Sequence, residues 1–98
     1  MEKKELDRGG ESNTIVYTVT WNETKGQRLK RIRGASFEEL FEGELLDIRD
    51  NPARSNQNIM IFDYHGYIWA VPCVVEGQEI FLKTLYRSRK YFKIYKKR

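Results

Sequence analysis

Basic and aromatic side chains are concentrated in the last eighteen residues of the chain, FLKTLYRSRKYFKIYKKR. This segment, residues 81–98, contains eight Lys or Arg, three Tyr and two Phe, and it contains no acidic residue. Lys and Arg bind phosphate oxygens, and aromatic rings stack on nucleic-acid bases. The composition therefore predicts a surface that holds RNA. The alternative is a basic chain end whose rings simply pack into the core.

A second basic segment lies nearer the N-terminus and is followed by an acidic one. Residues 25–33, KGQRLKRIR, contain five bases and no acid, whereas residues 35–50 contain six acids and one Arg. The formal net charge is only +4, so the charge is segregated along the chain. If the two basic segments meet, they form a face that attracts a polyanion, and the acidic segment keeps the polyanion off the remaining surface.

One strand and two helices are predicted in the first half of the chain. Residues 14–21, TIVYTVTW, are β-branched and aromatic in alternation, which indicates a strand. Asn22 can cap a helix over residues 23–33, which Gly34 closes. Ser36 and Glu39 form a capping-box pattern, so a second helix is expected to start there.

Three strands are predicted in the second half, after extended chain and loop over residues 44–57. The apolar runs NIMIFDY, YIWAVPCVV and EIFLKTLY are separated by short Gly-containing turns, which predicts an antiparallel meander. Pro72 has no N–H for a central strand, so we expect a bulge over residues 71–73. The predicted fold class is α+β, β-α-α-β-β-β, with the two helices on one face of the sheet and a short C-terminal helix from about residue 90.

The period of the last strand assigns its side chains to two faces. In a strand over residues 78–86, Lys83 shares a face with Arg87 and Arg89, while Ile80 and Leu82 point to the other face and pack against the helices. Tyr86 has the opposite parity to Lys83. It reaches the same site only if the strand twists strongly or a bulge intervenes.

Composition excludes several classes of protein. One Cys and one His cannot form an internal disulfide or a zinc site, so we expect no metal and no cofactor. No apolar run approaches the length of a membrane span, and the N-terminus lacks a signal-peptide pattern, which favours a cytoplasmic protein without membrane contact. Residues 1–13 have the composition of a disordered N-terminal tail, leaving residues 14–98 as a single domain.

Three motifs in a fixed order carry a family resemblance. WNETK at residues 21–25, GASFEE at 34–39 and FLKTLYRSRK at 81–90 resemble the BrnT-type toxins of bacterial type II toxin-antitoxin systems, ribonucleases with a RelE-like fold. The resemblance spans residues 15–95. Family members often have His where this chain has Arg33, and Ser where it has Arg87. The resemblance implies metal-independent cleavage of RNA that blocks translation, an antitoxin that neutralises the toxin, and binding of operator DNA by their complex.

RNA supplies its own nucleophile, the 2′-hydroxyl, so a ribonuclease needs groups that move protons and stabilise the phosphorane charge. The resemblance implies that Lys, Arg and Tyr do this in place of a His pair. The residues expected to act in catalysis are Lys25, Lys83, Tyr86 and Arg89, with Tyr91 as a substitute for Tyr86. Those expected to bind RNA are Arg28, Arg31, Arg87, Lys90, Tyr91 and Lys93.

Two other functions remain open from the sequence. The chain could be a non-catalytic nucleic-acid-binding module on the same fold, or a protein-interaction domain whose basic strip docks an acidic partner. His65 lies in a His-Gly turn and is expected to tolerate an unusual backbone conformation there rather than to act in acid-base chemistry.

Overall fold

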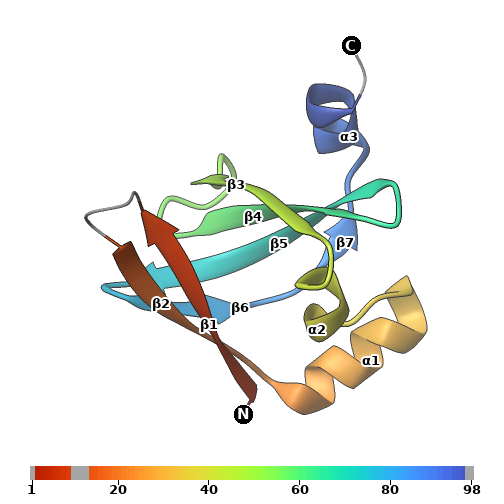
Figure 1. The fold of residues 1–98 in the computed structure, drawn as a ribbon. Helices are drawn as coiled ribbons and strands as arrows, with labels where there is room; N and C mark the ends of the chain where they lie inside the picture. The colour runs from red at the N-terminus through yellow and green to blue at the C-terminus, as the bar shows by residue number, and fades with distance from the viewer. Residues whose placement is uncertain (1, 10–13, 97–98) are drawn as a thin grey trace.

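A curled, mainly antiparallel sheet and three helices form the structure, a computed structural model that describes residues 2–9 and 14–96 (Figure 1). Along the sheet the strand order is β1-β2-β6-β5-β4-β3, and the short β7 pairs with β5. Strands β2 and β6 run parallel, whereas the other pairs are antiparallel. The strands are β1 (Glu2–Gly9), β2 (Thr14–Trp21), β3 (Glu44–Asp50), β4 (Asn58–Tyr64), β5 (Tyr67–Glu76), β6 (Glu79–Leu82) and β7 (Tyr86–Arg87).

Strand β1 is a departure from the prediction of a disordered tail over residues 1–13. It pairs with the whole length of β2 at the edge of the sheet. Its polar composition suits an edge strand, because charged side chains there discourage pairing with another molecule. Leu6 is half-buried and packs against the core, while Lys4 and Glu5 are exposed. The predicted tail is therefore wrong for residues 2–9, and residues 1 and 10–13 lie outside the described part of the chain.

The predicted helix boundaries are confirmed for α1 (Glu23–Arg33) and for the start of α2 (Phe37–Leu40). The Asn22 side chain accepts a hydrogen bond at the start of α1, and Gly34 ends the helix with φ of 95°. Ser36 and Glu39 form both halves of the capping box. None of the helices in the described residues is long and apolar enough to cross a membrane.

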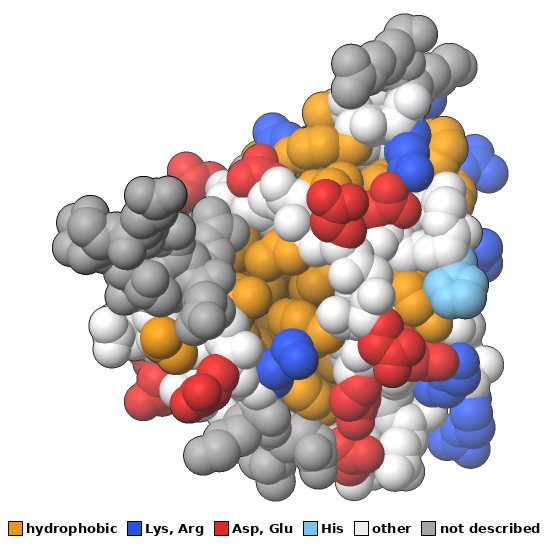
Figure 2. Space-filling model, viewed as in Figure 1, with side chains coloured by type: hydrophobic (Ala, Val, Ile, Leu, Met, Phe, Trp, Pro, Cys, Tyr) orange, Lys and Arg blue, Asp and Glu red, His pale blue; other side chains and the backbone are white. Residues whose placement is uncertain are grey.

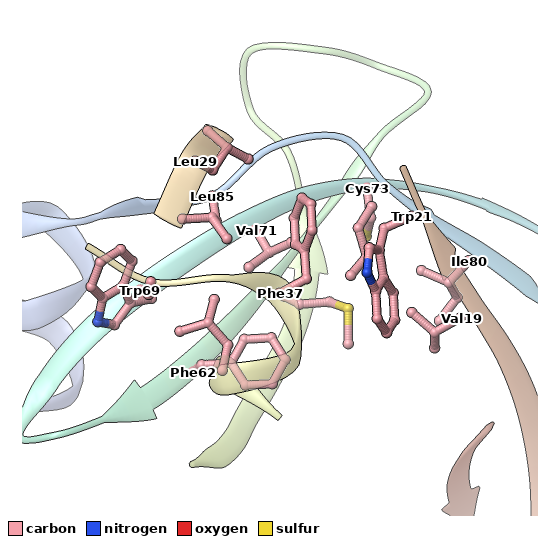
Figure 3. Close-up of a cluster of buried hydrophobic side chains, with 14 residues drawn as sticks. Val19, Trp21, Leu29, Phe37, Phe62, Trp69, Val71, Cys73, Ile80 and Leu85 are labelled. Atoms are coloured by element: carbon pink, nitrogen blue, oxygen red, sulfur yellow. The ribbon is translucent and has the colours of Figure 1, made fainter. Parts of the chain in front are cut away.

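Two hydrophobic clusters lie on opposite faces of the central strands. Met60 of β4 and Val71 of β5 belong to the larger cluster with residues of α1 and α2, whereas Ile61 and Ala70, their neighbours in sequence, belong to the smaller one. Figure 3 shows the larger cluster, in which Phe37 of α2 lies among the strand side chains. Burial on both faces explains why β4 and β5 are continuous apolar runs rather than alternating ones.

The C-terminal helix α3 (Arg89–Tyr95) packs on the face opposite α1 and α2. Its Tyr91 is only 3% exposed and belongs to the smaller cluster, against which Phe92 and Tyr95 also pack. The Tyr95 hydroxyl donates to Asp47 of β3 at 2.8 Å. The helix predicted near the C-terminus is thus present. The prediction that two helices cover one face of the sheet holds for α1 and α2, whereas α3 packs on the other face.

Pro72 interrupts the sheet, but at a different place from the one predicted. Strand β5 pairs with β4 without a register shift from Asn58 to Tyr64, so the bulge expected over residues 71–73 is absent from this pairing. The Lys83 N–H donates to the Pro72 carbonyl at 2.8 Å, and Pro72 has no N–H with which to return the bond. Pairing therefore stops after Leu82, and residues 83–85 leave the sheet before β7 begins.

This interruption changes the parity of the side chains that follow. Leu85 is fully buried in the larger cluster together with Ile80 and Leu82. Tyr86 instead packs against the smaller cluster on the opposite face. The continuous strand over residues 78–86 and the single basic row through Lys83, Arg87 and Arg89 are consequently wrong.

The concave face in Figure 2 is apolar at its centre. Hydrophobic side chains are visible in a hollow there, with several acidic side chains along its border. A cavity of about 240 Å³ is lined by one residue from each of strands β2 to β6, namely Tyr17, Ile48, Asn58, Val75 and Ile80. None of the basic residues predicted to bind RNA lines this cavity.

Candidate nucleic-acid interface

Three of the four residues predicted to act in catalysis line one cavity of about 410 Å³. Lys25 comes from α1, Lys83 from the segment that leaves β6, and Tyr86 from β7. Arg54, from the loop between β3 and β4, lines the same cavity. The fold thus brings together two ammonium groups, a guanidinium and a phenol from segments that are far apart in the sequence.

Lys25 lies in the first turn of α1, where the helix cap holds its backbone. Its N–H donates to the Asn22 side-chain oxygen at 2.9 Å. A cation in the first turn of a helix is disfavoured by the helix dipole by about 0.3–1 kcal/mol. The position of Lys25 is therefore not explained by helix stability, which is consistent with a role in binding an anion.

Lys83 owes its position to the interruption of the sheet at Pro72. Its N–H still donates to the Pro72 carbonyl, so its backbone is held at the end of β6. The side chain is exposed, and its Nζ lies 5.8 Å from the centroid of the Phe81 ring. A regular strand would have continued past this point, whereas the break turns residues 83–85 toward α1.

Tyr86 is half-buried, and its phenol retains its proton at neutral pH. Burial raises the pKa of Tyr86 above its ordinary value of 10.0, with a further increase from Tyr91 and a partial decrease from Arg33. A phenol with a raised pKa is a hydrogen-bond donor at pH 7. Tyr86 can therefore donate to a phosphate oxygen or a leaving oxygen within this cavity.

Arg33 connects the C-terminal end of α1 to the segment that carries Lys83 and Tyr86. Its guanidinium donates to the Leu85 carbonyl at 2.7 Å, a contact between residues 52 positions apart. Residues 83–85 have left the sheet, so their carbonyl groups need other partners. This hydrogen bond thus helps to hold one wall of the cavity in place.

Arg54 was not predicted from the sequence, where it stands alone in a polar loop. The loop is closed by backbone hydrogen bonds from Asn51 to Gln57, from Arg54 to Asn51 and from Gln57 to Arg54, and the Asn51 side chain accepts from the Ala53 N–H. These turns position Arg54 beside the cavity. The only available signal was a cation in a turn-forming loop of the kind that carries binding residues.

The remaining predicted residues do not line this cavity. Arg28 and Arg31 are exposed on α1, whereas Arg89, Lys90 and Lys93 are exposed on α3. Arg87 lines a different cavity. The structure corrects the prediction for Tyr91. Its ring is buried, with the charged ends of Arg49 and Lys90 5.0 and 5.4 Å from the ring centroid. The ring therefore cannot stack on a base.

His65 has the unusual backbone conformation that its place before Gly66 predicted. Its φ is 52°, in the left-handed region that few residues with a side chain adopt. The ring is exposed and lies 4.1 Å from that of Tyr64. His65 does not line the cavity that contains Lys25.

Comparison with solved structures finds the crystal structure, at 1.1 Å resolution, of the Brucella abortus ribonuclease toxin BrnT. The match has a TM-score of 0.48 and 18% sequence identity, and it covers 71% of this chain and 94% of that chain. No family model matches the sequence. No curated protein matches it either.

The cavity is suited to a phosphodiester group. Lys25, Lys83 and Arg54 supply positive charge, and Arg in particular can donate two parallel hydrogen bonds to phosphate oxygens. A volume of about 410 Å³ is in the range of small-ligand sites. Within residues 2–9 and 14–96, no group of three or more His, Cys, Asp or Glu side chains is placed to hold a metal ion.

Proposed function

We propose that this chain is an endoribonuclease that cleaves RNA without a metal ion and acts as the toxin of a toxin-antitoxin pair. The observation that carries the proposal is the convergence of Lys25, Lys83, Tyr86 and Arg54 on one cavity. The motifs shared with BrnT-type toxins support the toxin role. They further imply a cognate antitoxin that neutralises the protein, with operator DNA bound by their complex.

The proposed reaction is attack of the 2′-hydroxyl of RNA on the adjacent phosphorus. Lys25 or Lys83 accepts the proton of that hydroxyl as the general base. Arg54 and the other lysine stabilise the extra charge on the phosphorane oxygens. Tyr86 donates its proton to the departing 5′-oxygen. The products are a 2′,3′-cyclic phosphate end and a 5′-hydroxyl end.

Incubation of the purified protein with RNA in the presence of EDTA tests this reaction. We expect cleavage that leaves 2′,3′-cyclic phosphate ends, because the attacking oxygen belongs to the RNA itself. Lys25→Ala and Lys83→Ala should each lower the cleavage rate by about 100-fold or more, and Tyr86→Phe by a comparable factor.

Lys4→Ala is the matched control, because Lys4 is an exposed lysine of β1 that does not line the cavity and is not among the residues expected to bind RNA. Its cleavage rate should stay within a few-fold of the wild-type rate. Equal losses in Lys83→Ala and Lys4→Ala would refute the assignment of this cavity. RNA that binds with a strong salt dependence but remains intact would identify a non-catalytic binding module instead.

The toxin role has a separate test in bacteria. Expression of the chain alone should stop growth, and the double variant Lys25→Ala and Lys83→Ala should relieve the arrest at an equal level of folded protein. Growth arrest that persists in the double variant would show that toxicity does not depend on the lysines of this cavity.

A further inference from the structure

A second cavity, of about 420 Å³, lies beside the C-terminal half of α1. Its lining includes Lys30 of α1, Glu39 of α2, the turn between β4 and β5, and Arg87 of β7. It shares no lining residue with the cavity that contains Lys25. No role was predicted for most of these residues, and the reaction proposed above does not use them.

Aromatic rings form one wall of this second cavity. The guanidinium carbon of Arg87 lies 5.7 Å from the centroid of the Tyr67 ring and 5.8 Å from that of Trp69. Tyr67 also stacks on Phe92 of α3, with ring centroids 4.9 Å apart and planes 27° apart. Figure 3 shows Trp69 at the margin of the buried cluster, apart from Trp21. These contacts hold the rings and the guanidinium in place before any ligand arrives.

The lining of this cavity also includes groups that can donate hydrogen bonds to the edge of a base and accept hydrogen bonds from it. Lys30 Nζ and Glu39 Oε2 form an ion pair at 2.8 Å. Glu39 is ionised at neutral pH, because the hydrogen bond from Lys30, together with that from the Ser36 backbone, lowers the pKa of its carboxyl group. A carboxylate accepts hydrogen bonds from the amino groups of bases, and an ammonium donates to their carbonyl and ring acceptors.

The two cavities border the same two segments of the chain. Helix α1 contributes Lys25 to the first and Lys30 to the second, about 7.5 Å apart along the helix axis at 1.5 Å per residue. Residues 86 and 87 are adjacent in β7, and they too line one cavity each. The hydrogen bond from Arg33 to Leu85 joins the two segments. One strand of RNA could therefore reach both cavities within a few nucleotides.

We propose that the second cavity binds a nucleobase of the same single-stranded RNA whose phosphate enters the first cavity. The base stacks against Tyr67 and the guanidinium of Arg87, in the way that bases stack on aromatic and Arg planes in RNA-binding proteins. Lys30 and Glu39 meet its edge and select among bases. This inference rests on the proposed ribonuclease function and adds to it a determinant of sequence preference.

Cleavage of short RNAs with every base at each position tests the inference. The wild-type protein should prefer one or two bases, by about 10-fold or more, at a fixed distance from the cleaved phosphate. Tyr67→Leu should abolish the preference while changing the rate on the poorest substrates less than about threefold. Tyr67→Phe keeps the ring and should keep the preference.

Leu at position 67 retains an apolar contact with Phe92, and thermal melts will establish that both variants are folded. A wild-type protein that cleaves without any base preference would overturn the inference and leave the proposed function standing. A preference that survives in Tyr67→Leu would overturn it as well.

A binding experiment makes the inference testable even if no RNA is cleaved. Trp21→Phe leaves Trp69 as the sole tryptophan, and its fluorescence can be followed during titration with the four ribonucleoside monophosphates and with ribose 5-phosphate. Saturable quenching by at least one nucleotide, but not by ribose 5-phosphate, supports a base site. Equal effects of all five compounds, or none, would overturn it. If Trp21→Phe does not fold, calorimetry of the wild-type protein with the same compounds gives the same comparison.

Discussion

Arg33 is predicted to position the cavity that contains Lys83 and Tyr86, and its replacement by Met tests that role. The Arg33 guanidinium donates to the Leu85 carbonyl at 2.7 Å across 52 residues of sequence. Met retains the apolar stem of the side chain and removes the donor. The variant should therefore lose one defined contact with little loss of packing.

The expected loss of stability follows from the exposure of this contact. A hydrogen bond from a charged donor contributes about 1.5–3 kcal/mol in favourable cases. Arg33 is an exposed residue, so solvent screening reduces the expected loss to about 1 kcal/mol. For a domain of this size that corresponds to a fall in melting temperature of about 4–8 °C. Thermal unfolding followed by circular dichroism measures it.

The effect on cleavage should be larger than the effect on stability. A shift of about 1 Å in reacting groups can lower a rate by about 100-fold, so we expect kcat to fall by about 10- to 100-fold. Arg33 also lowers the pKa of Tyr86. Its loss should therefore raise that pKa and move the alkaline limb of the pH-rate profile to higher pH. Single-turnover cleavage rates measured from pH 6 to pH 11 report both the fall in rate and the shift of the alkaline limb.

Arg31→Met is the matched control, because it removes the same charge from an exposed position of the same helix. Arg31 makes no hydrogen bond with the described residues, so its stability should change by less than about 0.5 kcal/mol. Because Arg31→Met removes only positive charge from the surface, it should raise the KM for RNA without lowering kcat. If Arg33→Met and Arg31→Met have the same kcat and the same pH profile, Arg33 has no positioning role and the reasoning is wrong.

Three further predictions concern the fold. Leu85→Ala should lower the free energy of unfolding by about 2–5 kcal/mol in urea titrations, because Leu85 is fully buried; a loss below about 0.5 kcal/mol would place it on an exposed face instead. Gly43→Ala should cost about 1–3 kcal/mol by the same measurement, since the added methyl group collides with the Asp63 carbonyl oxygen; no loss would contradict that close approach. Burial raises the pKa of the Cys73 thiol from 9.0 to about 11, so its contribution to stability is present below pH 9 and is lost as the pH rises through 11. The melting temperature measured from pH 8 to pH 11 should therefore fall more steeply for the wild type than for Cys73→Ala. Equal slopes of melting temperature against pH would contradict this.

Much of the local structure could be predicted from the sequence. Asn22, Gly34 and the Ser36 capping box set helix ends through contacts within a few residues, so their residue types suffice to predict them. The same is true of the Gly-containing turns between β4, β5 and β6. Strand β1 could not be predicted this way, because its polar residues form a strand only through pairing with β2 at the sheet edge.

The candidate site was predictable in its residue types and only partly in its geometry. Lys25, Lys83 and Tyr86 were predicted and share a cavity. The alternation of side chains along a regular strand had placed Tyr86 and Lys83 on opposite faces. Arg54 was missed because nothing in its local sequence indicates which part of the fold its loop approaches. Tyr91 was misassigned because an aromatic residue among bases can either stack on RNA or fill a core.

The sequence by itself determined both ends of α1, the start of α2 and the strands β2, β4 and β5, and it showed that positive charge is concentrated in two segments. Those properties depend on neighbouring residues along the chain. Only the tertiary structure decided what Pro72 does to the sheet. Pro72 accepts a hydrogen bond from the Lys83 N–H but has no N–H to donate in return. Residues 83–85 then leave the strand, and the side chains beyond them change faces. That change distributes the basic segment over two cavities and α3, because each position depends on partners distant in sequence.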